Sequence, residues 1–127
     1  MTNLFDSTIE TLNRSLDLHM QRHAVIADNI ANAETPGFKA LRVDFEESLA
    51  RAVEAGEQGL AGRDIASVQP TVSEETQSEM GQDLNTVDMD REMAAMTKNE
   101  VQYNAATQAI SKKFALLRYA ITEGSEK

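Results

Sequence analysis

The sequence has no cysteine and no tryptophan, and aromatic residues make up only 5% of it. The absence of cysteine excludes disulfide bonds and thiolate chemistry. With so few aromatic side chains, the hydrophobic interfaces have to be built from Leu, Ile, Met and Ala. No segment approaches the run of about eighteen apolar residues that a membrane-spanning helix needs, so we expect no direct membrane insertion.

Basic residues are also scarce, with 12 Lys and Arg against 21 Asp and Glu and a formal net charge of −9. Binding to nucleic acid or to an anionic membrane surface needs clustered Lys and Arg, so the composition argues against both partners. The acidic excess lies in residues 41–85, which carry 10 acidic and 3 basic residues, whereas residues 1–40 and 86–127 are nearly neutral. We therefore expect the two ends to be buried in an assembly and the centre to face solvent.

What the sequence does contain is a long heptad pattern over residues 86–122. This pattern indicates a helix that buries one narrow strip against partner helices. Such a helix is roughly 50 Å long, so the strip has to be covered by another helix of the chain, by neighbouring copies, or by both. The strip consists of Met89, Met93, Met96, Tyr103, Ile110, Phe114, Leu117 and Ile121, with the polar Glu100 and Thr107 at two of its positions.

Residues 1–36 show the same spacing and predict a second helix. The helix should stop at Thr35-Pro36-Gly37, because proline lacks a backbone donor and disfavours helical geometry in the residue before it. Aligning Phe5 with Ile121 in an antiparallel hairpin places His19 near Thr107. The strip of this helix consists of Ile9, Leu12, Leu16, His19, His23, Ile26 and Ile30.

Between the two helices the pattern changes twice. Residues 37–55 alternate at first and then repeat at helical spacing, which predicts a short extended segment and a short helix. Residues 56–85 hold four of the six glycines and few apolar side chains, so we expect a flexible acidic loop. The predicted fold is therefore all-α: two long terminal helices in an antiparallel coiled-coil-like hairpin, these middle segments, and a short tail over residues 123–127.

One motif carries a resemblance to a known family. Asn29 and Asn32 are followed by Thr35-Pro36-Gly37-Phe38-Lys39, which resembles the N-terminal signature of bacterial flagellar rod and hook axial proteins. Within that group, Val43-Asp44-Phe45 and the block from Val87 to Met93 are similar to proximal rod proteins. The resemblance covers residues 1–55 and 84–122.

The resemblance implies a structural subunit of the proximal rod of the flagellar basal body, which polymerises through its terminal helices into the torque-transmitting axial rod. The implied partners are other copies, other proximal rod subunits, the membrane (MS) ring with its rod adaptor, and the flagellar type III export apparatus. The implied location is the rod where it crosses the periplasm, reached without a cleaved signal peptide. The sequence start indeed lacks the basic and apolar regions of such a signal.

The motif residues also invite a physical interpretation. We expect Asn29 and Asn32 to hydrogen-bond the backbone of the turn at Thr35, Pro36, Gly37 and Phe38. From chemistry alone, two surface amides near a helix end are an equally good interpretation. A hairpin of two helices buries little surface in isolation, so we expect it to be completed by neighbouring subunits.

Other functions find less support in the residues. His19 and His23 are spaced to share a zinc ion, but interface histidines are the better interpretation because no further ligands follow a metal-site pattern. No catalytic residues or cofactor site are expected, since no nucleophile elbow or phosphate-binding glycine loop occurs. The alternatives are another rod or hook-junction axial protein and, in a different class, a coiled-coil adaptor or type III secretion chaperone.

Overall fold

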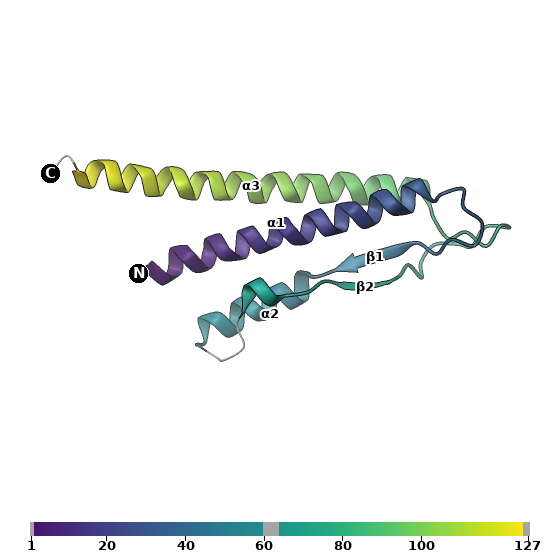
Figure 1. Ribbon diagram of the computed structural model, residues 1–127, viewed down its shortest axis with the longest axis horizontal. Coiled ribbons are helices and arrows are strands. Elements are labelled where there is room, and N and C mark those ends of the chain that lie inside the picture. Colours follow the sequence, from purple (N-terminus) through teal and green to yellow (C-terminus); the bar gives the residue numbers. More distant parts are fainter. Residues whose placement is uncertain (1, 60–63, 126–127) are drawn as a thin grey trace.

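The computed structural model describes residues 2–59 and 64–125 and is mostly helical. Two long helices, α1 (Thr2–Ala31) and α3 (Met89–Ser125), pack side by side and antiparallel (Figure 1). The chain between them folds back along α1 on the side away from α3 (Figure 1). The sequence prediction of two terminal helices in a hairpin is confirmed.

The middle of the chain forms four short elements. These are β1 (Leu41–Asp44), α2 (Glu46–Glu57), the 3-10 turn η1 (Ile65–Ser67) and β2 (Thr71–Glu74). β1 and β2 are antiparallel, with Val43 opposite Val72. The extended segment and short helix predicted for residues 37–55 are thus present. Residues 56–85, predicted from composition as a loop, contain η1 and β2, which composition did not predict.

The hydrophobic core lies between α1 and these middle elements. Leu18 of α1 is fully buried and packs with Val43 and Phe45 around β1 and with Val68 beyond η1. Nε of Arg14 donates to the carbonyl of Val68 at 2.9 Å, which ties the segment after η1 to α1. This small core fixes the middle elements on one side of α1, and α3 lies against another.

The register between α1 and α3 differs from the sequence prediction. His19 lies beside Asn99, to which it is hydrogen-bonded twice, and not beside Thr107. At His19, α3 is therefore displaced by eight residues, about 12 Å of helix, relative to the predicted alignment of Phe5 with Ile121, and at the bond between Asn29 and Glu92 it is displaced by five residues. One consequence is visible in Figure 1, where the C-terminal end of α3 projects beyond the start of α1.

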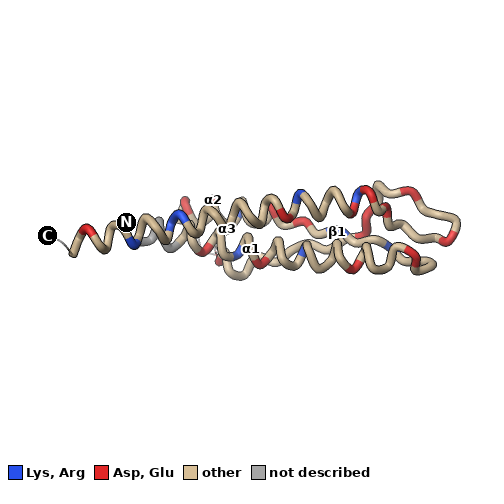
Figure 2. The backbone as a smooth tube through the Cα atoms, turned by 90° about the horizontal axis from the view of Figure 1, so that it is seen from above, with Lys and Arg blue, Asp and Glu red and all other residues tan. Residues whose placement is uncertain are grey.

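The charges of the chain are unevenly distributed, as the composition indicated. Acidic residues outnumber basic ones along the backbone, most clearly in the loops at the end where α1 ends and α3 begins (Figure 2). Among the described residues, no helix combines the length and the hydrophobicity needed to cross a membrane.

The loop before α3 contains a strained residue. Leu84 has a φ of 64°, in the left-handed region, and is held there by a bond from its amide to the carbonyl of Gly81 at 2.9 Å. The amide of Gly81 donates in turn to the carbonyl of Asn85 at 2.9 Å. The Leu84 side chain is 58% exposed, so its packing does not offset the strain.

We therefore predict that Leu84→Gly raises the free energy of unfolding by up to about 1 kcal/mol. The left-handed conformation costs a residue with a side chain about 1–2 kcal/mol, and the extra chain entropy of glycine returns about 0.4–1 kcal/mol of that. Urea unfolding followed by circular dichroism measures the change. Leu84→Ala keeps the strain and is the matched control; equal stabilities of the two variants would contradict the prediction.

Candidate functional site

The interface between α1 and α3 is built around polar side chains. His19 and Asn99 are both buried, and Asn99 is only 2% exposed. Nδ1 of His19 donates to Oδ1 of Asn99 at 2.7 Å, and Nδ2 of Asn99 donates to the backbone carbonyl of His19 at 2.8 Å. The imidazole also meets the ring of Phe45 edge-on, with the centroids 5.0 Å apart. This reciprocal pair therefore joins α3 to α1 and, through Phe45, to the core.

A second buried amide joins three segments near the end of α1. Asn29 is 1% exposed, and its side chain pairs with both backbone groups of Leu41: Nδ2 donates to the carbonyl at 2.7 Å, and Oδ1 accepts from the amide at 3.0 Å. Nδ2 also donates to a carboxylate oxygen of Glu92 on α3 at 3.1 Å. One side chain thus holds α1, β1 and α3 together.

Asn29 shares the outer edge of β1 with Arg22. Leu41 and Val43 turn backbone groups away from β2, and Nε and a terminal nitrogen of Arg22 donate to the carbonyl of Val43 at 3.0 and 2.8 Å. The guanidinium also pairs with Glu46 at 2.6 Å and lies 4.2 Å from the centre of the Phe45 ring. The two α1 side chains, seven residues apart, thereby satisfy an edge that otherwise attracts further strands.

The turn after α1 is held by a residue that the sequence analysis missed. Nδ2 of Asn85 donates to the carbonyls of Asn32 and Thr35 at 2.9 and 2.7 Å. Gly37, with a φ of 74°, donates its amide to the carbonyl of Asp83 at 2.8 Å. The loop before α3 therefore fixes the turn, and the available sequence signal was the Asx-type pattern at Asn85, whose Oδ1 accepts from Val87.

The two motif asparagines differ from the prediction that both bond the turn backbone. Asn29 bonds the backbone of Leu41, beyond the turn. Asn32 donates to the carbonyl of Asp28 and accepts from the hydroxyl of Thr35 at 3.1 Å, so it bonds a side chain of the turn. Pro36 and Gly37 are exposed, and Phe38 is half-buried.

Two carboxyls near this junction have shifted pKa values in opposite directions. Burial raises the pKa of Glu92; the Asn29 amide opposes this shift, and the nearby charges of Glu75 and Asp88 add to it. The hydrogen-bonded ion pair with Arg22 lowers the pKa of Glu46 to about 2. In the part of the chain that the structure describes, Glu92 therefore has no cationic hydrogen-bond partner, although the charge of Arg91 acts against the rise in its pKa, whereas Glu46 is firmly ionised.

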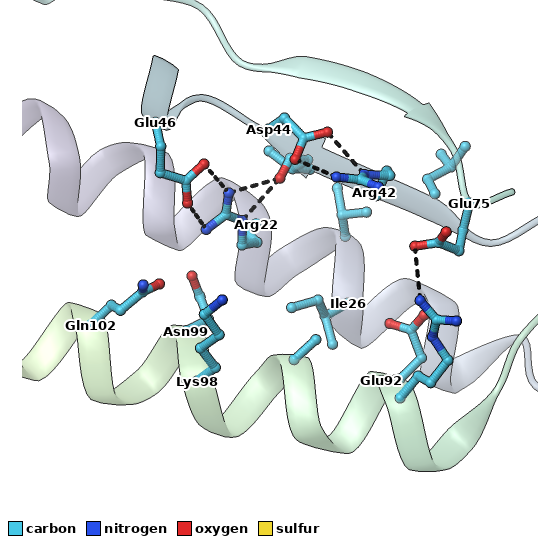
Figure 3. Close-up of a pocket in the computed structure, with 15 residues that line it drawn as sticks. Arg22, Ile26, Arg42, Asp44, Glu46, Glu75, Glu92, Lys98, Asn99 and Gln102 are labelled. Carbon is cyan, nitrogen blue, oxygen red and sulfur yellow. Dashed lines mark hydrogen bonds and ion pairs between the residues drawn. The ribbon is translucent and has the colours of Figure 1, made fainter. Parts of the chain in front are cut away.

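A groove of about 440 Å³ lies between α1, β1 and α3 (Figure 3). Most of its charged side chains face one another in pairs, including Arg42 with Asp44 at 2.9 Å and Arg91 with Glu75 at 4.0 Å, whereas Glu92 and Lys98 are in no ion pair with a described residue. Within residues 2–59 and 64–125, no three His, Asp or Glu side chains come together as a metal site would require. The groove is therefore lined mainly by charges that are already paired within the chain.

The predicted strip of α3 divides into two sets. The α1 side carries four of its members together with residues that the prediction left out: Glu92, Met96, Asn99, Tyr103, Ala106, Ile110, Lys113 and Leu117, all buried or half-buried. The other predicted members are exposed: Met89, Met93, Glu100, Thr107, Phe114 and Ile121. Met96, Tyr103, Ile110 and Leu117 belong to both the observed and the predicted set. The observed set adds residues three positions after a shared residue, such as Asn99 after Met96. The predicted set adds residues four positions after it, such as Glu100.

The predicted strip of α1 lies mostly inward. Ile26 and His19 are buried, and His23 is exposed. The remaining members are half-buried: Ile9, Leu12, Leu16 and Ile30. His19 is thus an interface residue, as predicted, and His23 faces solvent in the single chain.

Comparison with known proteins gives consistent matches. A family model described as flagella basal body rod protein matches residues 10–39, from the first half of α1 through Asn29 to the turn. The flagellar basal body rod protein FlgB of Escherichia coli (strain K12) is 32% identical over 130 residues, covering 87% of this chain and 90% of the relative. FlgB of Bacillus subtilis (strain 168) is 31% identical over 96% of this chain and 98% of its own length. FlgB of Borrelia hermsii is 30% identical over 94% and 98%.

The bonds of Asn29 predict a large effect of its removal. Asn29→Ala leaves both backbone groups of Leu41 and one oxygen of Glu92 without a partner, so we expect a loss of about 2–4 kcal/mol of unfolding free energy. Asn32→Ala, in the same motif but with local bonds alone, should cost less than about 1 kcal/mol. Urea unfolding compares the two, and equal losses would contradict the assigned role.

The two carboxyls predict opposite pH dependences. Because the pKa of Glu92 is raised above 4.5 in the folded chain, the folded chain keeps this proton to a higher pH than the unfolded chain does. The contribution of Glu92 to the free energy of unfolding is therefore full below 4.5 and is lost as the pH rises through the raised pKa. The lowered pKa gives Glu46 a contribution that is full above 4.5 and is lost as the pH falls toward about 2.

Glu92→Gln should therefore gain stability relative to the parent chain as the pH rises from about 4 to neutral. Glu46→Gln should be destabilised at neutral pH, with the penalty shrinking as the solution is acidified. Chemical unfolding of the three proteins across this range measures both trends. A Glu92→Gln difference that stays constant with pH would contradict the assignment for that carboxyl.

Proposed function

The chain belongs to the FlgB family of flagellar basal body rod proteins and is a non-enzymatic structural subunit of the proximal rod, and we propose that it is built into the rod through the exposed apolar side chains of α3. The proposal concerns the surfaces that make the contacts. It rests on the way in which α3 divides its apolar residues between α1 and solvent.

The observation that carries the proposal is an apolar strip on α3 that the single chain leaves uncovered. We call it the outer strip and define it as Met89, Met93, Phe114 and Ile121, all exposed, with Phe114 at 53% and Ile121 at 72%. Burying one such side chain stabilises an interface by about 1.5–3 kcal/mol. Exposed large apolar residues that repeat at helical spacing are typical of a surface that another helix covers.

A second uncovered set lies elsewhere on the same helix. Val101, Leu116 and Tyr119 are each about 60% exposed, and their helical phase places them on the side of α3 roughly opposite the outer strip. The end of α3 also projects beyond α1 (Figure 1). A helix with apolar residues on several sides is suited to being surrounded by neighbours. The contacts of α3 therefore extend to subunits on more than one side.

As a rod protein the chain is part of the flagellar basal body assembly. We further propose that its neighbours are other copies and other proximal rod subunits, with the membrane (MS) ring and its rod adaptor at the base. We also propose that the chain passes through the flagellar type III export apparatus, without a cleaved signal, and reaches the periplasmic part of the rod. The absence of cysteine supports it, since no disulfide has to form after an unfolded chain is threaded.

The same proposal assigns roles along the chain. The segments predicted as residues 1–36 and 86–122 supply the assembling helices, and the segments between them brace these helices. The predicted tail over residues 123–127 is corrected in part, because α3 continues to Ser125. α1 contributes Ile9, Leu12, Leu16, His19, His23, Ile26 and Ile30, of which the exposed His23 is available to neighbours. The polar α1–α3 interface supports this view, because it leaves the most apolar surface of α3 outside the hairpin.

We predict that Phe114→Glu leaves the hairpin folded and abolishes rod assembly, because it places a charge in an interface between subunits. Swimming in soft agar and purified basal bodies measure assembly when the variant is the sole copy in a motile bacterium. Gln21→Glu adds the same charge at an exposed position of α1, outside both uncovered sets of α3, and should retain motility. Normal rods with Phe114→Glu would contradict the proposed contact.

A further inference from the structure

Two faces of α3 compete for α1, and the more apolar one is left outside. Both contain Met96, Tyr103, Ile110 and Leu117. The face that α1 covers adds Glu92, Asn99, Ala106 and Lys113; the face left outside adds Met93, Glu100, Thr107, Phe114 and Ile121. A rotation of α3 by roughly 50° about its axis exchanges one face for the other.

Hydrophobic burial alone favours the alternative. The covered face adds Glu92, Asn99, Ala106 and the half-buried Lys113, whereas the outside face adds the large apolar Met93, Phe114 and Ile121 together with the polar Glu100 and Thr107. Burying polar groups costs free energy unless they are hydrogen-bonded, and Oε1 of Gln102, beside this interface, is buried with no partner among the described residues. A specific interaction therefore has to select the observed rotation.

The reciprocal pair of His19 and Asn99 has the required geometry. Its two bonds, at 2.7 and 2.8 Å, involve a side chain and a backbone carbonyl of α1, so both the rotation and the register of α3 are defined at this point. Asn29 and Glu92 repeat the constraint two turns nearer the loop, at 3.1 Å. Beyond Asn99 toward the C-terminus, the residues of the covered face are half-buried. Single buried polar residues set register in coiled coils in this way, at a cost in stability.

We propose that His19 and Asn99 are positioning residues that turn α3 so that its outer strip stays exposed for neighbouring rod subunits. The benefit of that exposure rests on the function proposed above, whereas the selection of the rotation does not. Replacing the pair by leucines leaves Asn29 and Glu92 to position only the start of α3, and it releases the preference for apolar burial in the part of α3 beyond Asn99. The outer strip is then covered by α1, and the subunit becomes a hairpin that buries this apolar surface within the single chain.

The chain contains no cysteine, so single cysteines report the rotation directly. Ala106→Cys reports the covered face and Phe114→Cys the outer strip, and both sites lie beyond Asn99. In the otherwise native chain, thiol alkylation should be fast at position 114 and slow at position 106. In the His19→Leu, Asn99→Leu background the ratio of the two rates should fall severalfold, with the helix content and the Tm kept or raised.

The matched control is Gln21→Leu with Gln108→Leu, which adds two leucines at exposed positions of the same helices. This variant should keep the native ratio of alkylation rates. Asn99→Ala is a milder second variant that should shift the ratio in the same direction. The proposal is overturned if the ratio of alkylation rates is unchanged both in the double leucine variant of His19 and Asn99 and in Asn99→Ala. Loss of helix in both also overturns it, because the pair would then act on stability and not on orientation.

The last measurement is motility with the leucine pair variant as the sole copy, which should be lost although the protein is folded. A shifted alkylation ratio with full motility would leave the positioning role standing and overturn the use of the outer strip in assembly. An unchanged ratio of alkylation rates in the leucine pair variant, together with loss of motility in Phe114→Glu, would overturn the positioning role and leave the use of the outer strip in assembly standing. The two proposals therefore fail separately.

Discussion

The side-chain amide of Asn29 is the interaction on which the arrangement of the segments depends. It supplies the outer edge of β1 with the donor and acceptor that another strand would provide, and it reaches Glu92 on α3 as well. Because it is 1% exposed, water cannot replace these bonds. The return of the chain after α1, the position of the two-stranded sheet and the start of α3 are thereby fixed at one point. Asn85 secures the turn between them.

Away from that junction, the two sides of α1 are held by different forces. Toward the middle elements, Leu18, Val43 and Phe45 form a small apolar core in which burial itself is stabilising. Toward α3, the contact depends on hydrogen bonds of His19 and Asn29 and on half-buried side chains. Hydrogen bonds contribute only about 0.5–1.5 kcal/mol each to folding, so α3 gains less from this contact than a helix of its length gains in a closed core. In the proposed assembly, neighbouring subunits supply the remainder.

The heptad spacing was sufficient to predict both long helices, and alternation predicted β1. It was not sufficient to predict β2, because the four residues Thr71–Glu74 are all exposed and owe their conformation to pairing with a strand thirty residues earlier. The roles of Asn29 and Asn85 were also beyond local patterns, since their partners lie in other segments. The motif did mark Asn29 and Asn32 as a pair, and the structure separates a buried residue that joins segments from one with local bonds.

The error in the α1–α3 register has a physical explanation of its own. The heptad spacing of apolar residues shows which side of a helix is buried, but it does not show whether the covering partner belongs to the same chain or to another. In a subunit that works inside a polymer, the strongest apolar strip need not be the one that closes the monomer. Phe114 and Ile121 are members of the predicted strip, and they are exposed in the single chain, where the proposed contacts with neighbouring subunits would bury them. By the proposal above, a hairpin that covered them would be the more stable monomer and the poorer subunit, and polar residues such as Asn99 at the inner face oppose that arrangement.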